Sequence, residues 1–260
     1  MIKIAHEAPL SIFDKVQELT DYDYFLVHLF EENEEYLSKA HECVAKGRET
    51  ILDNSIFELG HAWDASRFAH WVNEMRPTFY IVPDVLDDCD KTIDSFEKFM
   101  KEYSDLPGKV IAVAQGSTYN DLVLCYNYLA NDDRVDKIAL SFNHPFFQEY
   151  TGDNQYYKMM HGRQDTLSKM LSEGVINTNK PHHLLGCGLP QEFTAYKDYE
   201  WIDSLDTSNP VIHGIKDMWY TGRGLVDKES VKLYTMMNDD VNKNWAAIHY
   251  NILTFRSMCQ

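Results

Sequence analysis

The sequence predicts an α/β protein that folds as a single (β/α)8, or TIM, barrel over residues 1–260. Short runs rich in apolar and β-branched residues alternate along the chain with longer amphipathic stretches of helical periodicity. These runs number roughly eight, and 260 residues is a typical length for one such barrel. An open doubly wound sheet is the alternative, but no glycine-rich dinucleotide fingerprint follows the first run.

The strand candidates are nearly continuous in apolar residues, as expected of parallel strands that are covered on both faces. In chain order they are 1–7, 24–30, 49–54, 78–85, 109–116, 137–142, 182–189 and 201–208. Helical patterns separate the earlier ones, at 33–47, 65–75, 92–104 and 119–132. Gly47 and Pro77 are stop signals, and Ser117 is a candidate N-cap for the fourth helix. The longest irregular stretch, 143–163, predicts an elaborated loop after the sixth strand.

Composition limits the location and the partners. Lys plus Arg is 24 and Asp plus Glu is 41, a formal net charge of −17, which gives no general electrostatic help in binding a nucleic acid. Solubility alone explains such a surplus. No run of about 18 apolar residues predicts a membrane span, and the N-terminus lacks a signal-peptide layout. Five scattered cysteines without a CxxC pair predict neither a disulfide framework nor a cysteine zinc site, and favour a reducing cytoplasm.

Four strand candidates end in a polar residue: Asp53, Asp84, Gln115 and Asp206. In a barrel the carboxyl ends of the strands converge on one mouth. One such aspartate is usually a cap or turn residue, but four from separate strands are harder to explain in that way. Aspartate and glutamine suit the edge of a heterocyclic base, and two further aspartates suit a nucleophile and an acid/base in glycosyl transfer.

A metal site is the weaker interpretation of these strand ends. No H-x-H or HExxH pattern lies on the strands. His182 and His183 are adjacent, so they face opposite sides of a strand and cannot chelate together.

Five segments in order resemble the tRNA-guanine transglycosylases (queuine tRNA-ribosyltransferases). "LDNSIFELG" (52–60) is similar to the family's Asp-Ser-Gly-Gly-Phe-Gln segment, keeping Asp53 and Phe57 with Glu58 in place of the glutamine. "IVPDVLDD", "VAQG", "HHLLGCGLP" and "WIDSLD" resemble the family's Asp-Glu-Cys, Val-Gln-Gly, His-Tyr-Leu-Met-Gly-Val-Gly-Lys-Pro and Gly-Ile-Asp-Met-Phe-Asp segments. The resemblance covers about residues 52 to 206, and "AIHYNILTF" (247–255) resembles the closing helix.

This resemblance implies a base-exchange reaction and assigns the two catalytic roles. Asp206 would be the nucleophile that attacks the anomeric carbon of a guanosine-type nucleotide, releasing guanine and forming a covalent aspartyl-glycosyl intermediate. Asp53 would be the acid/base that handles the proton of the outgoing and incoming bases. No cofactor is implied.

The resemblance also implies how the base is bound. Phe57 would stack on the base, while Asp84 and Gln115 would hold its edge. The backbone of Leu185 and Gly186 would line the pocket.

The chain departs from the family at the zinc site. The bacterial tRNA enzymes carry a C-terminal zinc bound by three closely spaced cysteines and a histidine. His249 lies near the place of that histidine, but the cysteines are absent, so we expect no metal, no zinc subdomain and a packing role for His249. The sixth-strand segment "KIALSFNHP" (137–145) lacks the family's glycines, and Leu86 stands where the family often has Cys.

A short, zinc-free chain of this kind resembles the phage and genomic-island DNA transglycosylases, which exchange guanine for a 7-deazaguanine such as preQ0. The resemblance therefore implies DNA as the favoured polynucleotide, with tRNA as the alternative. It also implies the host cytoplasm as the location if the protein is phage-encoded, and a homodimer as a possible assembly.

Holding a polynucleotide requires positive charge and an extruded base. The nucleic-acid-binding candidates lie in the loops after the last three predicted strands, and the main ones are Lys216 and Arg223. Further cations are Lys158, Arg163 and Lys180, interleaved with the aromatic residues Phe146, Phe147, Tyr156, Tyr157, Trp219 and Tyr220. Stacking platforms with scattered cations hold strands without reading sequence, and the equal alternative is that these aromatics only pack loops.

Two other functions stay open. A base-excising N-glycosidase would keep the nucleophile and use water as the acceptor. A non-catalytic partner subunit would need neither Asp53 nor Asp206, so their presence argues against it, while the net charge of −17 argues mildly for it.

Overall fold

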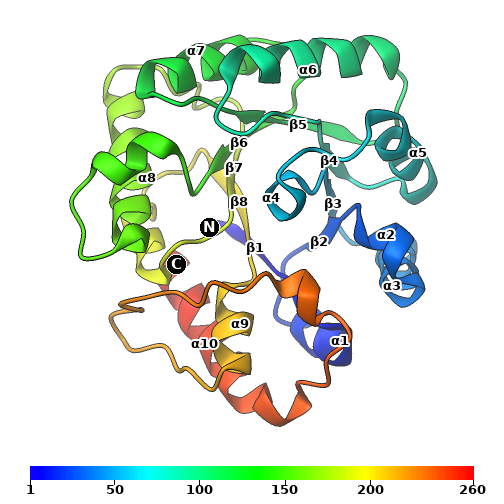
Figure 1. Ribbon diagram of the computed structural model, residues 1–260, viewed down its shortest axis with the longest axis vertical. Helices are drawn as coiled ribbons and strands as arrows, with labels where there is room; N and C mark the ends of the chain where they lie inside the picture. Colours follow the sequence, from blue (N-terminus) through cyan, green and yellow to red (C-terminus); the bar gives the residue numbers. More distant parts are fainter. The chain divides into compact units, whose positions relative to one another are not determined.

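The computed structural model describes all residues from 1 to 260 and has the predicted α/β fold, a (β/α)8 barrel of parallel strands connected by helices (Figure 1). Along the sheet the strands follow the order β1-β8-β7-β6-β5-β4-β3-β2. The strands are β1 (Lys3–His6), β2 (Asp23–Leu26), β3 (Thr50–Asp53), β4 (Phe79–Ile81), β5 (Lys109–Ala114), β6 (Lys137–Ser141), β7 (His182–Leu185) and β8 (Ile202–Thr207).

Ten α-helices and five short 3-10 helices lie between and after the strands. The α-helices are α1 (Phe13–Gln17), α2 (Leu29–Glu32), α3 (Glu34–Ala45), α4 (Ile56–Leu59), α5 (Ala65–Met75), α6 (Cys89–Glu102), α7 (Tyr119–Ala130), α8 (Gln155–Ser172), α9 (Asn209–Ile215) and α10 (Trp245–Cys259). The 3-10 helices are η1 (Leu10–Ile12), η2 (Pro145–Glu149), η3 (Pro190–Ala195), η4 (Leu233–Met236) and η5 (Asn242–Asn244). None of the helices combines the length and the apolar character of a membrane span.

The structure corrects three local expectations. The stretch 143–163 is only partly a loop, because α8 begins within it after the N-cap Asn154, whose side chain accepts the N–H groups of Tyr156 and Tyr157. The N-cap of α7 is Thr118 rather than Ser117. A regular (β/α)8 barrel has an α-helix after every strand, but none follows β7 here. The connection from β7 to β8 contains only the 3-10 helix η3.

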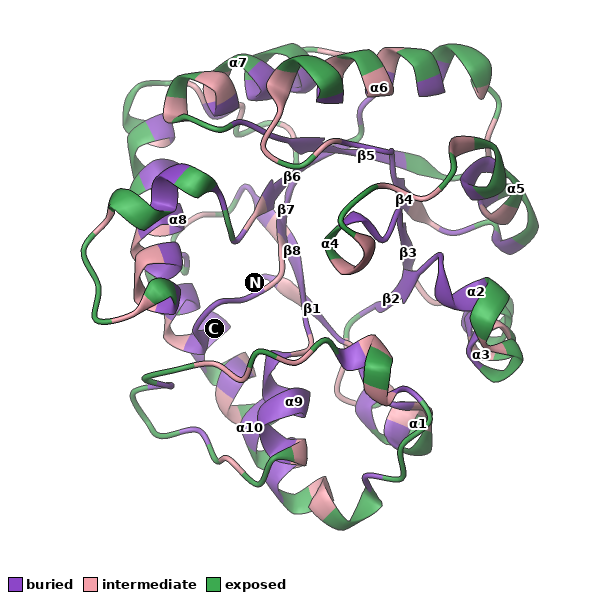
Figure 2. Ribbon diagram, in the orientation of Figure 1, coloured by how far each residue is buried: buried purple, intermediate pink, exposed green.

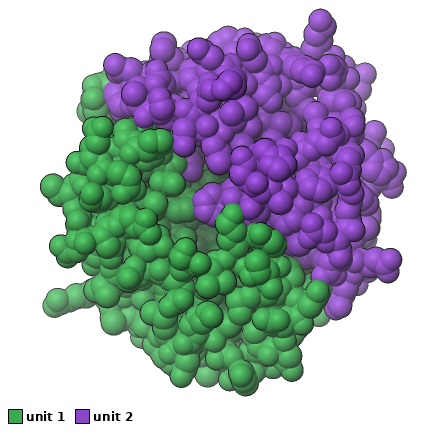
Figure 3. Space-filling view, viewed as in Figure 1, with its two compact units in different colours: residues 1–21, 142–178, 183–260 green, residues 22–141, 179–182 purple.

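The chain divides into two compact units (Figure 3). Unit 1 comprises Met1–Asp21, Phe142–Thr178 and His183–Gln260, and unit 2 comprises Tyr22–Ser141 and Asn179–His182. Unit 2 contains β2 to β6 with α2 to α7. Unit 1 contains β1, most of β7, and β8, with α1, α8, α9 and α10.

In unit 2 the strands are apolar because they are covered on both faces. Residues Val110–Ala114 of β5 are all buried, and α6 and α7 lie side by side over this strand (Figure 1). The buried side of α6 includes Phe96 and Phe99. Along the helix, buried positions alternate with exposed ones (Figure 2). Its N-terminus is capped by Asp88, whose side chain accepts the N–H of Lys91.

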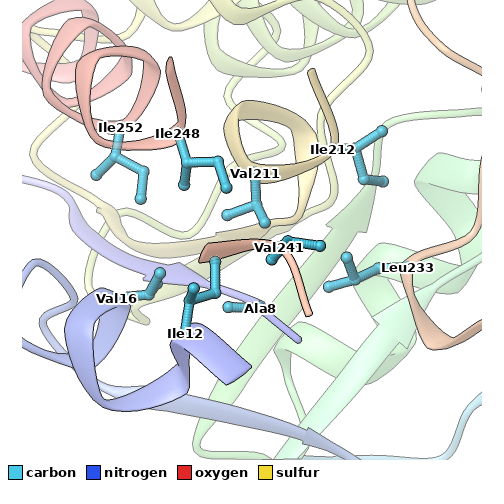
Figure 4. Packing of buried hydrophobic residues seen from close by; sticks show 9 residues of the cluster. All are labelled: Ala8, Ile12, Val16, Val211, Ile212, Leu233, Val241, Ile248 and Ile252. Atoms are coloured by element: carbon cyan, nitrogen blue, oxygen red, sulfur yellow. The ribbon is translucent and has the colours of Figure 1, made fainter. Parts of the chain in front are cut away.

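In unit 1 a second apolar cluster joins α1, α9 and α10 with the segments on either side of them (Figure 4). Its buried members are Ala8, Ile12, Val16, Val211, Ile212, Leu233, Val241, Ile248 and Ile252. The close approach of α9 to α10 depends on Gly214, because a Cβ there would lie 2.5 Å from Cα of Ile248. This cluster supports α9, the helix that follows β8 and its strand-end residue Asp206.

Candidate active site

The predicted site residues lie at or just beyond the carboxyl ends of their strands. Asp53 is the last residue of β3, and Gln115 comes directly after β5. Asp84 lies in the segment after β4, and Asp206 lies near the end of β8. The first three belong to unit 2, and Asp206 belongs to unit 1. All four side chains are buried or nearly so.

In unit 2 the structure brings Asp84 and Gln115 into direct contact. Gln115 Nε2 donates to Asp84 Oδ2 at 2.7 Å, and Asn54 Nδ2 donates to Asp84 Oδ1 at 2.8 Å. The backbone N–H of Asp87 donates to Gln115 Oε1 at 3.2 Å, which fixes the orientation of the glutamine amide. Each carboxylate oxygen can still accept a further hydrogen bond, so the pair offers acceptors to a ligand with paired N–H donors.

Burial raises the pKa of Asp84 to about 6, although the hydrogen bonds from Gln115 and Asn54 act in the opposite direction. A carboxyl group with this pKa is mainly ionised at neutral pH and becomes protonated in mild acid. Its capacity to accept hydrogen bonds therefore depends on pH in a range that experiments can reach.

Asp53 accepts hydrogen bonds from residues of unit 2. The Tyr24 hydroxyl donates to Asp53 Oδ2 at 2.7 Å, and the backbone N–H of Ser55 donates to Asp53 Oδ1 at 2.5 Å. The second bond closes a tight turn, and Asn54 closes the next one by accepting the N–H of Ile56. The turn role expected of a single strand-end aspartate is thus present, in addition to any catalytic role.

Two residues with a left-handed backbone lie close to Asp53 and Gln115. Of the four non-glycine residues with positive φ, Ser55 (φ 63°) follows Asp53 and Asp87 (φ 60°) holds Gln115. Such conformations cost on the order of 1–3 kcal/mol each and gather at functional sites. Close by on the same segment, the Phe57 side chain is 48% exposed at the start of α4.

In unit 1 only one oxygen of Asp206 is hydrogen-bonded. Asp206 Oδ1 lies 3.0 Å from Nε2 of His183 and accepts the backbone N–H of Gly186 at 3.2 Å. Oδ2 makes no hydrogen bond. His183 Nδ1 in turn lies 3.0 Å from the Ser204 hydroxyl. The predicted pocket residue Gly186 therefore contacts the proposed nucleophile through its backbone.

The backbone around Gly186 is held by a buried ion pair. Arg163 Nε lies 2.5 Å from Glu192 Oε1, and its other nitrogens donate to the carbonyls of Leu185 and Gly186 at 2.9 and 3.0 Å. Arg163 is 1% exposed, so it is unsuited to the phosphate contact expected from the sequence. Its hydrogen bonds fix the backbone of Leu185 and Gly186, and the N–H of Gly186 donates to Asp206.

Lys228, which the sequence did not indicate as a site residue, contacts the same segment. Lys228 Nζ donates to the Cys187 carbonyl at 2.7 Å and lies 4.8 Å from the centre of the Phe142 ring. Burial lowers the pKa of Lys228, and the nearby carboxylates of Glu7 and Asp206 oppose this shift. Lys228 lies in a polar loop without regular structure, so its sequence context gave no signal of the burial.

The surface cations and aromatics differ in how they are placed. Lys216 and Arg223 are exposed, whereas Lys158 and Lys180 donate to backbone carbonyls at 3.1 and 2.8 Å. For four of the aromatic candidates the loop-packing interpretation is correct, because they are buried: Phe146, Phe147, Tyr156 and Tyr220. Trp219 is 48% exposed, and its ring packs beside that of Tyr250 with ring centres 5.2 Å apart.

No group of three or more His, Cys, Asp or Glu side chains is arranged to hold a metal ion. The ring of His249, near the family's zinc histidine, is half-buried and packs against Trp245 with ring centres 5.5 Å apart.

The chain matches no protein-family model and no curated protein.

Proposed function

We propose that this protein is a nucleic-acid guanine transglycosylase, which exchanges guanine for a 7-deazaguanine of the preQ0 type, with DNA favoured as the polynucleotide. The observation that carries the proposal is the setting of Asp206. A nucleophilic carboxylate has to be held in one orientation with one oxygen unblocked. Asp206 meets both requirements, since Oδ1 is hydrogen-bonded twice and Oδ2 is not.

The reaction would proceed in two displacements. A lone pair of Asp206 Oδ2 forms a bond to C1′ while the bond from C1′ to guanine N9 breaks, and the departing base takes the electron pair together with a proton from Asp53. The incoming 7-deazaguanine then returns its N9 proton to Asp53. Its nitrogen attacks C1′ and releases the Asp206 carboxylate.

The Asp84–Gln115 pair would select the base. The free lone pairs of the Asp84 carboxylate match the adjacent N1–H and N2–H donors of guanine and of 7-deazaguanines that keep this edge. Phe57, with its ring partly exposed, would stack on the base. Lys216 and Arg223 are exposed cations that would contact phosphates.

The alternatives differ in the acceptor and the polymer. A base-excising N-glycosidase would use the same nucleophile with water, and a tRNA enzyme would use the same chemistry on another polynucleotide. A non-catalytic partner subunit is disfavoured by the buried, oriented Asp206, because a binding surface has no need of it.

The nucleophile assignment gives the central prediction. Asp206→Ala and Asp206→Asn should abolish both exchange and a covalent protein–polynucleotide adduct, because no neighbouring group replaces an aspartate that forms the bond. The assay is incubation with radiolabelled guanine or preQ0 and either duplex DNA or tRNA, followed by counting of the polymer. The adduct should accumulate when no acceptor base is supplied and be visible on a denaturing gel.

Two variants serve as comparisons. Asp53→Ala should slow exchange by about 10²–10⁴-fold through lost proton transfer, without removing the attacking group. Asp203→Ala is the control on β8, because alternation places Asp203 on the face opposite Asp206. Loss of the adduct in Asp203→Ala with retention in Asp206→Asn would show that the wrong carboxylate has been assigned.

A further inference from the structure

We infer that His183 and Ser204 are positioning residues that orient the Asp206 carboxylate, so that Oδ2 rather than Oδ1 forms the bond to the sugar. The inference rests on the proposed function, in which Asp206 is the nucleophile. Neither residue is required to touch the substrate. Both act through Asp206.

The three side chains form a continuous hydrogen-bonded chain on neighbouring strands. Ser204 and Asp206 are two residues apart on β8 and therefore project from the same face. His183 on β7 lies between them, with Nδ1 3.0 Å from Ser204 Oγ and Nε2 3.0 Å from Asp206 Oδ1. His183 and Ser204 are completely buried and Asp206 is 6% exposed, so bulk water does not compete with these bonds.

The chemistry of the three groups sets the direction of each bond. An ionised carboxylate has no proton to give, so Nε2 of His183 must carry the hydrogen that it shares with Asp206 Oδ1. In a neutral imidazole, Nδ1 then carries a lone pair, and the hydrogen in the second bond has to come from the Ser204 hydroxyl. Ser204 thus selects the Nε2–H tautomer of His183.

This arrangement leaves one oxygen for the reaction. Oδ1 accepts from His183 and from the N–H of Gly186, so rotation of the carboxylate would break two bonds at once. When Oδ2 forms the ester bond to C1′, Oδ1 becomes the ester carbonyl oxygen and can keep both donors. The same two hydrogen bonds therefore hold the group before and after the bond to the sugar forms.

His182 provides a matched control within the same strand. It is as buried as His183, but its Nε2 lies 2.8 Å from the Tyr126 hydroxyl and its ring stacks on the Tyr126 ring. A variant of His182 removes a buried imidazole without touching the chain of bonds to Asp206.

The test is a single-turnover measurement of adduct formation by the full-length protein on the polynucleotide that supports exchange. His183→Phe should reduce the rate by about 10²-fold, the loss expected when a reacting group is misplaced by about 1 Å. Ser204→Ala should reduce it by about tenfold, the equivalent of one hydrogen bond. The double variant should be no slower than His183→Phe, because the contact of Ser204 with His183 is its route to Asp206.

Other readouts separate positioning from simple support of the fold. His183→Gln, which keeps an N–H donor, should recover part of the lost rate. The dissociation constant for preQ0 should not change in any of these variants. His182→Gln should form the adduct within about twofold of the parent rate when equal amounts of folded protein are compared, since its loss leaves every bond to Asp206 in place.

A second measurement needs no substrate and applies even if His183→Phe does not fold. The ¹⁵N spectrum of the histidine-labelled protein should show His183 as the Nε2–H tautomer, and Ser204→Ala should give a mixture of tautomers. An Nδ1–H tautomer in the parent protein, or fully additive effects of the two substitutions, would overturn the inference. An Asp206→Asn variant that still forms the adduct would instead overturn the proposed function.

Discussion

Asp84 is a buried carboxylate beyond the end of β4 whose contacts suit it to bind the edge of a base. Both of its oxygens already accept one amide donor, so its remaining lone pairs are fixed in direction. Asp84→Ala should weaken binding of guanine or preQ0 by about 3 kcal/mol, because the paired donors of the base would lose a charged acceptor. Calorimetric titration of the base into the protein measures this loss.

The exposed Asp90, in the first turn of α6, provides the matched control. Asp90→Ala also removes a carboxylate, but from the exposed surface of α6, so it should leave the affinity for the base unchanged. Unchanged affinity in Asp84→Ala as well would mean that the base is bound elsewhere.

The raised pKa of Asp84 also predicts how stability depends on pH. Between the ordinary value of 3.8 and about 6, the folded protein keeps a proton that the unfolded chain has released. The contribution of Asp84 to the free energy of unfolding should therefore fall as pH rises through this window, by about 3 kcal/mol for a shift of about two units. Urea unfolding at pH 4 and pH 7 should show most of this loss as a difference between the parent protein and Asp84→Ala, because buried His6, whose pKa is lowered to about 3, makes the same opposite contribution in both proteins. An equal pH dependence in both proteins would contradict the assignment.

The candidate site could be found from the sequence only where position along a strand was enough. Asp53, Asp84, Gln115 and Asp206 stand out because each follows an apolar run. Their partners do not stand out, because contacts such as His183 with Asp206, or Asn54 with Asp84, join residues 23 and 30 positions apart. Such pairings depend on which strands become neighbours and in what register.

The packing of α9 against α10 depends on a glycine at their closest approach. Gly214→Ala would place a Cβ 2.5 Å from the backbone of Ile248, which cannot move aside as a flexible side chain could. We expect a loss of about 1–3 kcal/mol in the free energy of unfolding, as for other overpacked sites. Chemical denaturation provides the measurement.

Gly222 is the matched control, since a Cβ there would meet nothing within 4 Å and its φ is not positive. Gly222→Ala should be neutral or stabilising by up to about 1 kcal/mol, through the reduced entropy of the unfolded chain. Equal stability of the two variants would show that α9 and α10 pack less closely than described.

The strands were predictable because buried parallel strands are apolar throughout. Seven of the eight candidates contain an observed strand, and the candidate 24–30 overlaps β2, which begins at Asp23. The helix α8 was only partly predictable. Its buried side includes Tyr156, Gly162, Arg163 and Thr166, so the apolar periodicity that marks a helix is interrupted by polar and small residues. The buried Arg163 is compensated by Glu192, a partner that no local pattern indicates.

For the whole molecule, the net charge of −17 is the property that the proposed function must accommodate. A polyanion is repelled by the average field of this chain, so binding has to come from local cations and from stacking. Lys216 and Arg223 are exposed cations of unit 1, and Trp219 is an exposed aromatic residue between them in the sequence.

The salt dependence of binding tests this view. Each phosphate contact releases counterions, so removing one cation should weaken binding of all DNA sequences alike and reduce the slope of log K against log salt by about 1. Lys216→Ala and Arg223→Ala should each do so, and the double variant should lose about twice as much slope because the residues act independently. Fluorescence anisotropy of a labelled duplex over a series of salt concentrations measures both quantities.

Lys98→Ala is the control. It removes an exposed lysine of α6 and should change neither the affinity for DNA nor the slope. If Lys98→Ala weakens binding as much as the other two, the effect comes from net charge alone, and the segment after α9 is not the nucleic-acid contact.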